Sequence, residues 1–216
     1  MRGIFITFEG IEGSGKSTLV SQLALLLKNK GIDPLITREP GGTALGRELR
    51  AILLNPAGAD IQPLSELLLY AADRAQHIRE VIGPALDEGK TVLCDRFSDA
   101  TAAYQGYGRG IPLETIRSAD GLAREGRIPD LTVLLDLPPD EGLERARSRN
   151  ARDGAGAETR MDDEQPEFHR KVREGYLDLA RQQPDRFLIL DASNRPEHMA
   201  SRVLTVFMER FPHAFR

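Results

Sequence analysis

Residues 4–17 read I-F-I-T-F-E-G-I-E-G-S-G-K-S, a short apolar run that leads directly into a glycine-rich loop and a lysine. The loop, residues 10–17, fits the pattern G-x-x-x-x-G-K-[ST] in full. Its glycines allow backbone N–H groups to turn inward around phosphates, and a helix starting near Lys16 adds its positive end to the same site. This stretch therefore predicts a strand, a phosphate-binding loop and a helix that together bind a nucleoside triphosphate.

The whole loop is a candidate binding site. Lys16 can reach the β- and γ-phosphates, and the Ser17 hydroxyl can bind Mg²⁺. The simpler alternative is a glycine-rich turn that holds no ligand. The expected nucleotide-binding residues are Gly10, Ile11, Glu12, Gly13, Ser14, Gly15, Lys16, Ser17 and Thr18.

Further along the chain, strand-like apolar runs alternate with segments of helical period. The runs cover residues 4–8, 34–37, 91–94, 131–135 and 187–190. They lack strict alternation, as strands buried on both faces do. Leu67, Leu68, Ala71, Ala75, Ile78 and Ile82 form one apolar helical face, and Leu19, Leu23, Leu26 and Leu27 another. The pattern predicts an α/β fold whose mainly parallel sheet is covered by helices on both faces.

Composition narrows the class of protein. The 216 residues suit one α/β domain, and a formal net charge of −4 gives no general attraction to nucleic acid or to an anionic membrane. Cys94 is the only cysteine, so no intrachain disulfide can form. The N-terminal residues lack the pattern of a signal peptide, and no stretch approaches the roughly 18 apolar residues of a membrane span. We expect a cytoplasmic protein with no membrane or nucleic-acid partner.

Polar residues follow two other predicted strands. Asp95 and Arg96 end the run T-V-L-C-D-R-F, where Asp95 can hold Mg²⁺ and Arg96 can grip a second phosphate with two hydrogen bonds. A structural Asp–Arg pair is the alternative. Arg38 and Glu39 follow the run at 34–37. Because ligands of such sheets bind beyond the carboxyl ends of the strands, these residues belong to the candidate site.

Tyr70 and Arg74 are four residues apart, so they share one face of a helix. An aromatic ring beside a guanidinium suits a flat base, although such a pair can also be an ordinary packed contact. The guanine-reading motif N-K-x-D of GTPases is absent, because Asn29-Lys30 is followed by Gly31-Ile32. A small domain of this kind points to phosphoryl transfer between small molecules.

Five motifs together resemble bacterial thymidylate kinase. They are F-E-G-I-E-G-S-G-K-S, T-R-E-P-G-G-T, Y-A-A-D-R-A-Q-H, C-D-R-F…A-Y-Q-G and E-F-H…V-R-E-G-Y-L, in order over roughly residues 4 to 191. The resemblance implies a nucleoside-monophosphate-kinase-like three-layer fold and a homodimer. It also implies the reaction ATP + dTMP → ADP + dTDP with Mg²⁺, a step of dTTP synthesis.

The same resemblance implies roles for individual residues. Tyr70 would lie on the thymine face, with Arg74 and Thr101 at the base. Tyr104 and Gln105 would line the deoxyribose. The remaining acceptor-site residues would be Arg96 at the acceptor phosphate, helped by Arg38 and Glu39, and Glu12 facing the sugar 3′-hydroxyl.

An arginine-rich segment at about 145–164 completes the single domain expected over residues 1–216. Arg145, Arg147, Arg149 and Arg152 crowd the end of a predicted helix, and Arg160 follows in a long loop from residue 150 to 165. We interpret this segment as a mobile lid that closes over the transferring phosphoryl group. A solvated helix end and an RNA-binding patch are the alternatives, although no aromatic residue interleaves with these arginines.

No arginine follows Glu12 in the loop, where Gly13 and Ser14 stand, so the chain resembles the form of the family whose catalytic arginine lies in the lid. Arg152 and Arg160 are the candidates. The lid departs from the family pattern because Thr159 precedes Arg160 where Asp is expected, and Asp162 replaces Glu.

Two rival functions remain open at this stage. One is a P-loop kinase for another acceptor, such as UMP, CMP, AMP or a small metabolite. The other is a regulator that senses ATP without phosphoryl transfer.

Overall fold

The five apolar runs each form a strand in the computed structural model, which describes residues 2–57, 60–153 and 160–215. The strands are β1 (Phe5–Glu9), β2 (Leu35–Arg38), β3 (Val92–Asp95), β4 (Leu131–Asp136) and β5 (Phe187–Asp191). They pair in parallel in the order β2-β3-β1-β4-β5. The predicted parallel sheet is confirmed, and each strand bound differs from the expected one by at most one residue.

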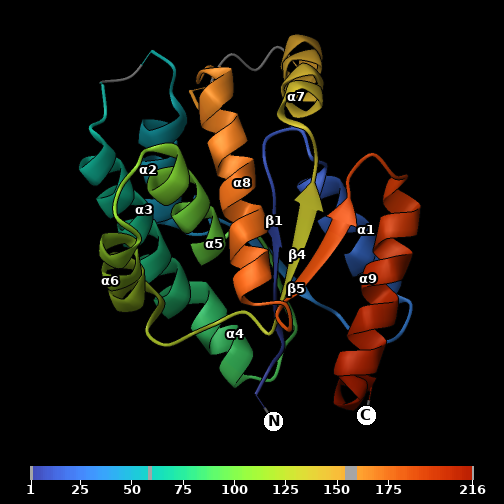
Figure 1. The fold of residues 1–216 in the computed structure, drawn as a ribbon. Helices are drawn as coiled ribbons and strands as arrows, with labels where there is room; N and C mark the ends of the chain where they lie inside the picture. Colours follow the sequence, from blue (N-terminus) through green and yellow to red (C-terminus); the bar gives the residue numbers. More distant parts are fainter. Residues whose placement is uncertain (1, 58–59, 154–159, 216) are drawn as a thin grey trace.

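Helices cover both faces of the sheet (Figure 1). On one face α1 (Lys16–Lys28) packs against α9 (Pro196–Arg210), and on the other α8 (Pro166–Gln182) packs against the π-helical segment η2 (Ala102–Gly108). The other helical segments are α2 (Ala44–Leu54), α3 (Pro63–His77), η1 (Ile78–Ile82), α4 (Gly83–Asp87), α5 (Ser98–Thr101), α6 (Leu113–Arg124), α7 (Pro139–Asp153) and η3 (Pro212–Phe215). The predicted three-layer arrangement is therefore confirmed.

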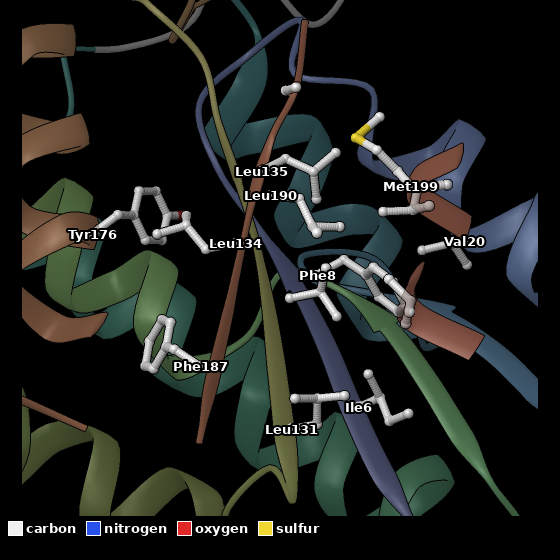
Figure 2. Close-up of a cluster of buried hydrophobic side chains, with 14 of the residues drawn as sticks. Ile6, Phe8, Val20, Leu131, Leu134, Leu135, Tyr176, Phe187, Leu190 and Met199 are labelled. Atoms are coloured by element: carbon white, nitrogen blue, oxygen red, sulfur yellow. The ribbon is translucent and has the colours of Figure 1, made fainter. Parts of the chain in front are cut away.

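The core has two apolar layers, because successive side chains of a strand point to opposite faces. Phe8 of β1 lies on the side of Val20 in α1, whereas Leu134 of β4 lies on the side of Tyr176 in α8 (Figure 2). All four side chains are buried. Among the helices in the described part of the chain, none is both long and apolar enough to cross a membrane.

Three details of the sequence interpretation are wrong. β2 and β5 are edge strands and are not buried on both faces: the side chains of β2 alternate between half-buried and exposed, and Ile189 of β5 is 48% exposed. Leu68 does not belong to the apolar face of α3, since it is 56% exposed. The helix before the arginine-rich loop is longer than expected, because α7 continues to Asp153 rather than ending near residue 150.

The strand register brings the candidate residues to one edge of the sheet. Phe8 of β1 and Arg38 of β2 are both opposite Asp95 of β3. The phosphate-binding loop leaves β1, the central strand, at the same edge. Because all five strands are parallel, every segment that follows a strand meets the others there.

The loop also touches the start of α7. Gly13 lies at φ +71°, and a Cβ atom added to it would be 2.0 Å from the carbonyl oxygen of Gly142 in α7. In return, a Cβ atom on Gly142 would be 2.6 Å from the carbonyl oxygen of Glu12. Two glycines thus allow the loop backbone and α7 to approach more closely than side chains would permit.

This contact gives a stability prediction. We expect Gly142→Ala to destabilise the protein by about 1–3 kcal/mol, because the new methyl group meets backbone that cannot move aside cheaply. Gly121→Ala is the matched control, since Gly121 is also helical but has nothing within 4 Å of an added Cβ atom.

Gly121→Ala should stabilise the protein by up to about 1 kcal/mol through the higher helix propensity of alanine. Thermal unfolding followed by circular dichroism measures the melting temperature of both variants. For a chain of this length, a change of about 1 kcal/mol in the free energy of unfolding shifts the melting temperature by about 2–4 °C. A Gly142→Ala protein that melts at or above the wild-type temperature would show that the contact is looser than described.

Candidate active site

The phosphate-binding loop closes around its own lysine. The Lys16 ammonium donates hydrogen bonds to the carbonyl oxygens of Gly10 (3.0 Å) and Ile11 (2.8 Å) and to the hydroxyl of Ser14 (3.3 Å). Burial, together with the nearby Arg96 guanidinium, lowers the pKa of Lys16 to about 8. A phosphate in the loop would offer the ammonium a full negative charge in place of these neutral oxygens, which would raise that pKa again.

The start of α1 strengthens this anion site. Gly15 is the N-cap residue at φ +89° and has no side chain to cap the helix. The first N–H groups of a helix have no partner within the helix, and the helix dipole is positive at this end. A phosphate in the loop can therefore accept hydrogen bonds from them.

Two oxygen groups meet beside the loop. The Ser17 hydroxyl donates to a carboxylate oxygen of Asp95 at 2.6 Å. Mg²⁺ prefers oxygen ligands and is usually held by one or two carboxylates together with phosphate oxygens. The residues present fit this ion, as the sequence predicts for Ser17 and Asp95.

Arg96 connects the end of β3 to the phosphate-binding loop. Its Nη1 donates to the carbonyl oxygen of Gly10 (3.1 Å) and to the Tyr176 hydroxyl (3.3 Å), and its Nη2 donates to Glu12 Oε1 (2.8 Å). The Arg96 backbone is left-handed at φ +69°, and its N–H donates to the carbonyl oxygen of Phe8. A strained conformation of this kind persists only where surrounding contacts fix it.

Glu12 is held from several sides. Its Oε1 accepts hydrogen bonds from Arg96 and from the Tyr104 hydroxyl, the latter at 2.7 Å. Burial alone would raise the pKa of Glu12, but the Arg96 guanidinium, together with the other polar and charged neighbours of the carboxylate, outweighs burial and holds the pKa well below its usual range. Glu12 is therefore ionised at neutral pH. It anchors the two cavity side chains that donate to it.

Arg74 lies in a buried cluster of charges. Its Nε donates to Glu39 (2.8 Å), its Nη1 to Asp120 (3.0 Å) and its Nη2 to the Thr101 hydroxyl (2.9 Å). The second oxygen of Glu39 lies 3.0 Å from Nδ1 of His77. The cluster fixes the guanidinium plane, and three of its five N–H donors already have partners. Glu39 therefore has both carboxylate oxygens engaged by Arg74 and His77.

A cavity of about 610 Å³ joins these groups. It is lined by thirteen of the predicted catalytic, binding and metal-ligating residues, and also by residues from both ends of the predicted lid. Its lining consists of Glu12, Gly13, Lys16, Ser17, Arg38, Glu39, Arg50, Leu54, Tyr70, Arg74, Asp95, Arg96, Phe97, Ala100, Thr101, Tyr104, Gln105, Arg149, Asn150, Met161 and Asp162. The phosphate-binding loop, the expected acceptor residues and the lid thus share one space.

The acceptor candidates are fixed to different degrees. Tyr70 lines the cavity, and burial, helped by the charge of Glu66, raises the pKa of its hydroxyl to about 12. The Gln105 amide donates to Glu66 at 2.8 Å, so this side chain points partly away from the cavity. Arg38, by contrast, is exposed.

Other predicted site residues lie outside the cavity lining. Four of them belong to the phosphate-binding loop: Gly10, Ile11, Ser14 and Gly15. Thr18 follows the loop and is exposed on α1. Arg160 donates to the carbonyl oxygen of Leu53 and to Glu66 (2.5 Å), so its guanidinium is directed at α2 and α3. Arg152 lies in the last turn of α7, and its side chain and Thr159 fall outside the described residues.

Two buried residues beside the loop, Glu9 and Tyr176, have no role assigned from the sequence. Glu9 is the last residue of β1 and is fully buried, and it accepts hydrogen bonds from the Phe97 N–H and the Tyr176 hydroxyl, both at 2.8 Å. Both residues stand in the motifs F-E-G and R-E-G-Y. An acid inside an apolar strand was the available signal, because such a group is rarely buried without a reason.

The chain is similar in sequence to proteins of one family. A sequence model described as "Thymidylate kinase" matches residues 8–203. Curated proteins named thymidylate kinase are similar over nearly the whole chain. The protein of Desulfosudis oleivorans is 50% identical over 97% of this chain and 98% of its own. That of Desulfovibrio desulfuricans is 55% identical over 90% of each chain, and that of Syntrophotalea carbinolica 53% over 92% of each.

Glu9 gives a prediction about pH. Burial, with the nearby Asp99 carboxylate, raises the pKa of Glu9 to about 8 from its model-compound value of 4.5. Between these two pH values the native state holds a proton that the unfolded state has lost. The contribution of Glu9 to the free energy of unfolding therefore falls as the pH rises through this range.

Glu9→Gln cannot ionise at this position, so its stability should not fall with pH in this way. We expect the free energy of unfolding of Glu9→Gln, minus that of the wild type, to increase by about 2–4 kcal/mol from pH 5 to pH 8.5. Urea unfolding at several pH values measures this difference, and the wild-type protein supplies the reference at each one. A difference that stays constant with pH would mean that Glu9 titrates in its ordinary range.

Proposed function

The chain belongs to the thymidylate kinase family and phosphorylates dTMP to dTDP with ATP, and we propose that the cavity at the carboxyl ends of the strands carries out this reaction. The supporting observation is that the phosphate-binding loop and Arg96 both reach the cavity, joined by the ion pair between Glu12 and Arg96. Phosphoryl transfer needs two phosphates held close together and little covalent chemistry from the protein.

On the donor side, the loop binds the triphosphate of ATP. Lys16 leaves the loop carbonyl oxygens and neutralises the β- and γ-phosphates, while the start of α1 donates N–H groups. Ser17 and Asp95 hold Mg²⁺, which when bound supplies further positive charge to the phosphate oxygens. These roles account for the two oxygen groups beside the loop and for the buried ammonium.

On the acceptor side, Arg96 and the exposed Arg38 bind the 5′-phosphate of dTMP. Tyr70 stacks on thymine, and the Arg74 cluster presents its remaining N–H donors to the base edge. Tyr104 lines the deoxyribose, where a ribose 2′-hydroxyl would meet its ring. Glu12 faces this sugar and at the same time holds Arg96 and Tyr104 in place.

The segment at about 145–164 acts as the lid of the single kinase domain, residues 1–216. Arg149 and Asn150 from α7, and Met161 and Asp162 beyond it, line the cavity, so both ends of the segment already border it. Closure brings an arginine onto the transferring phosphoryl group and excludes water. Arg152 and Arg160 remain the candidates, and Arg160 must first leave Glu66.

Two further proposals concern the protein as a whole. A homodimer is supported by exposed apolar side chains on three helices. These helices, α2, α3 and α6, lie side by side, with α3 packed against both of the others (Figure 1). Leu64 and Leu68 are both 56% exposed and Leu122 is 83% exposed, which a second copy would cover. A cytoplasmic location is supported by the single, free Cys94.

One assay separates this function from its rivals. The purified full chain is incubated with Mg²⁺-ATP and, in turn, dTMP, UMP, CMP and AMP, and ADP release is followed. We expect efficient turnover of dTMP. Turnover of UMP and CMP should be lower by at least about 100-fold, because the ribose 2′-hydroxyl of both would meet the ring of Tyr104 and the different base edge of CMP would leave hydrogen-bonding groups of the site unpaired.

Lys16→Ala is the control variant. It should lower turnover by about 10²–10³-fold through the loss of charge at the phosphates, with an unchanged melting temperature. Efficient turnover of UMP or AMP with none of dTMP would contradict the proposed acceptor. Binding of ATP without turnover of any acceptor would favour the regulator.

A further inference from the structure

One buried histidine beside Glu12 has no hydrogen-bond partner among the described residues. His169 lies in the first turn of α8 and is fully buried, and neither of its ring nitrogens has a partner among the described residues. A buried N–H group without an acceptor is costly, and an imidazole always carries at least one proton on nitrogen. His169 is therefore a buried donor with no acceptor within hydrogen-bond distance in the part of the chain that the structure describes.

The missing acceptor lies close by. Oε2 of Glu12 is also buried without a partner in the described part of the chain, and it lies 3.6 Å from Nδ1 of His169. A hydrogen bond between nitrogen and oxygen needs about 2.7–3.2 Å, so a shift of roughly half an ångström would satisfy both groups at once. Hydrogen bonds of active sites are often long in the free enzyme and shorten when the substrate binds.

The other oxygen of Glu12 is already committed. Oε1 accepts from Arg96 and from Tyr104, so the orientation of the carboxylate sets where both of these side chains lie. A second bond at Oε2 would prevent rotation of the carboxylate. His169 itself is held by the packing of its ring against Phe168, edge to face at 5.5 Å.

We propose that His169 is a positioning residue for dTMP phosphorylation, which donates from Nδ1 to Oε2 of Glu12 and thereby fixes the carboxylate that holds Arg96 and Tyr104. The proposal deepens the function proposed above and rests on it. His169 touches neither substrate. It acts through Glu12 on the acceptor side of the cavity, and the ATP side depends on the loop backbone and Lys16 instead.

Substitutions distinguish this role from simple packing. His169→Asn places an amide nitrogen where Nδ1 stands, His169→Gln places it where Nε2 stands, and His169→Leu supplies an apolar side chain. We expect His169→Asn to keep kcat/KM for dTMP within about threefold of the wild type, and the other two to lose about tenfold or more. KM for ATP should change by less than about twofold in all three.

The matched control is His198→Asn at an exposed position of α9, which should leave all kinetic constants unchanged. Equal losses in His169→Asn, His169→Gln and His169→Leu, or equal effects on dTMP and ATP, would overturn the proposal. A wild-type protein that does not phosphorylate dTMP at all would instead contradict the proposed function.

A spectroscopic measurement tests the bond without turnover. The chain has four histidines, so a proton–nitrogen correlation spectrum of protein labelled with ¹⁵N-histidine is simple to assign with the His169→Asn variant. With dTMP bound, we expect His169 to carry its proton on Nδ1 and this signal to shift in Glu12→Gln. A His169 ring protonated only on Nε2 would overturn the proposal.

Discussion

The ion pair between Glu12 and Arg96 is the constraint on which the site depends. Glu12 belongs to the loop after β1 and Arg96 to the segment after β3, and the two side chains meet at 2.8 Å with most of their surface buried. A charged pair in such surroundings is stable only if each partner keeps its hydrogen bonds. Gly10, Tyr104 and Tyr176 supply them, so the loop, η2 and α8 are tied to the same pair.

This arrangement keeps the cavity ready for two phosphates before they arrive. The rate of phosphoryl transfer depends mainly on positioning and on charges that need not rearrange. The second buried cluster, Arg74 with Glu39 and Asp120, orders the acceptor side in the same way. Breaking a buried pair leaves an uncompensated charge, so each cluster resists partial loss. Arg160, in the segment proposed as a lid, forms an ion pair with Glu66 of α3 in this structure.

Sequence patterns predicted the sheet because its central strands are short, apolar and buried on both faces. They predicted the phosphate site because a glycine loop, a lysine and a helix start form one local unit. The pattern failed where contacts distant in the sequence determine the structure. β2 and β5 are partly exposed because they lie at the edges of the sheet, and the π-helical segment η2 has no local signature. The sequence identified Arg160 as a candidate but could not predict where its side chain lies, because that depends on its contacts with Leu53 and Glu66. The unpartnered Glu12 and His169 atoms could be recognised only once both side chains were placed in space.

A double-mutant cycle on the Glu12–Arg96 pair tests most directly whether the two phosphate sites form one unit. The cycle compares kcat/KM for dTMP in Glu12→Gln, Arg96→Lys and the double variant. Contacting residues of one network couple by about 0.5–3 kcal/mol. If the pair works as one unit, we expect the double variant to be at least about fivefold more active than the product of the two single losses implies. Losses that simply multiply would contradict it.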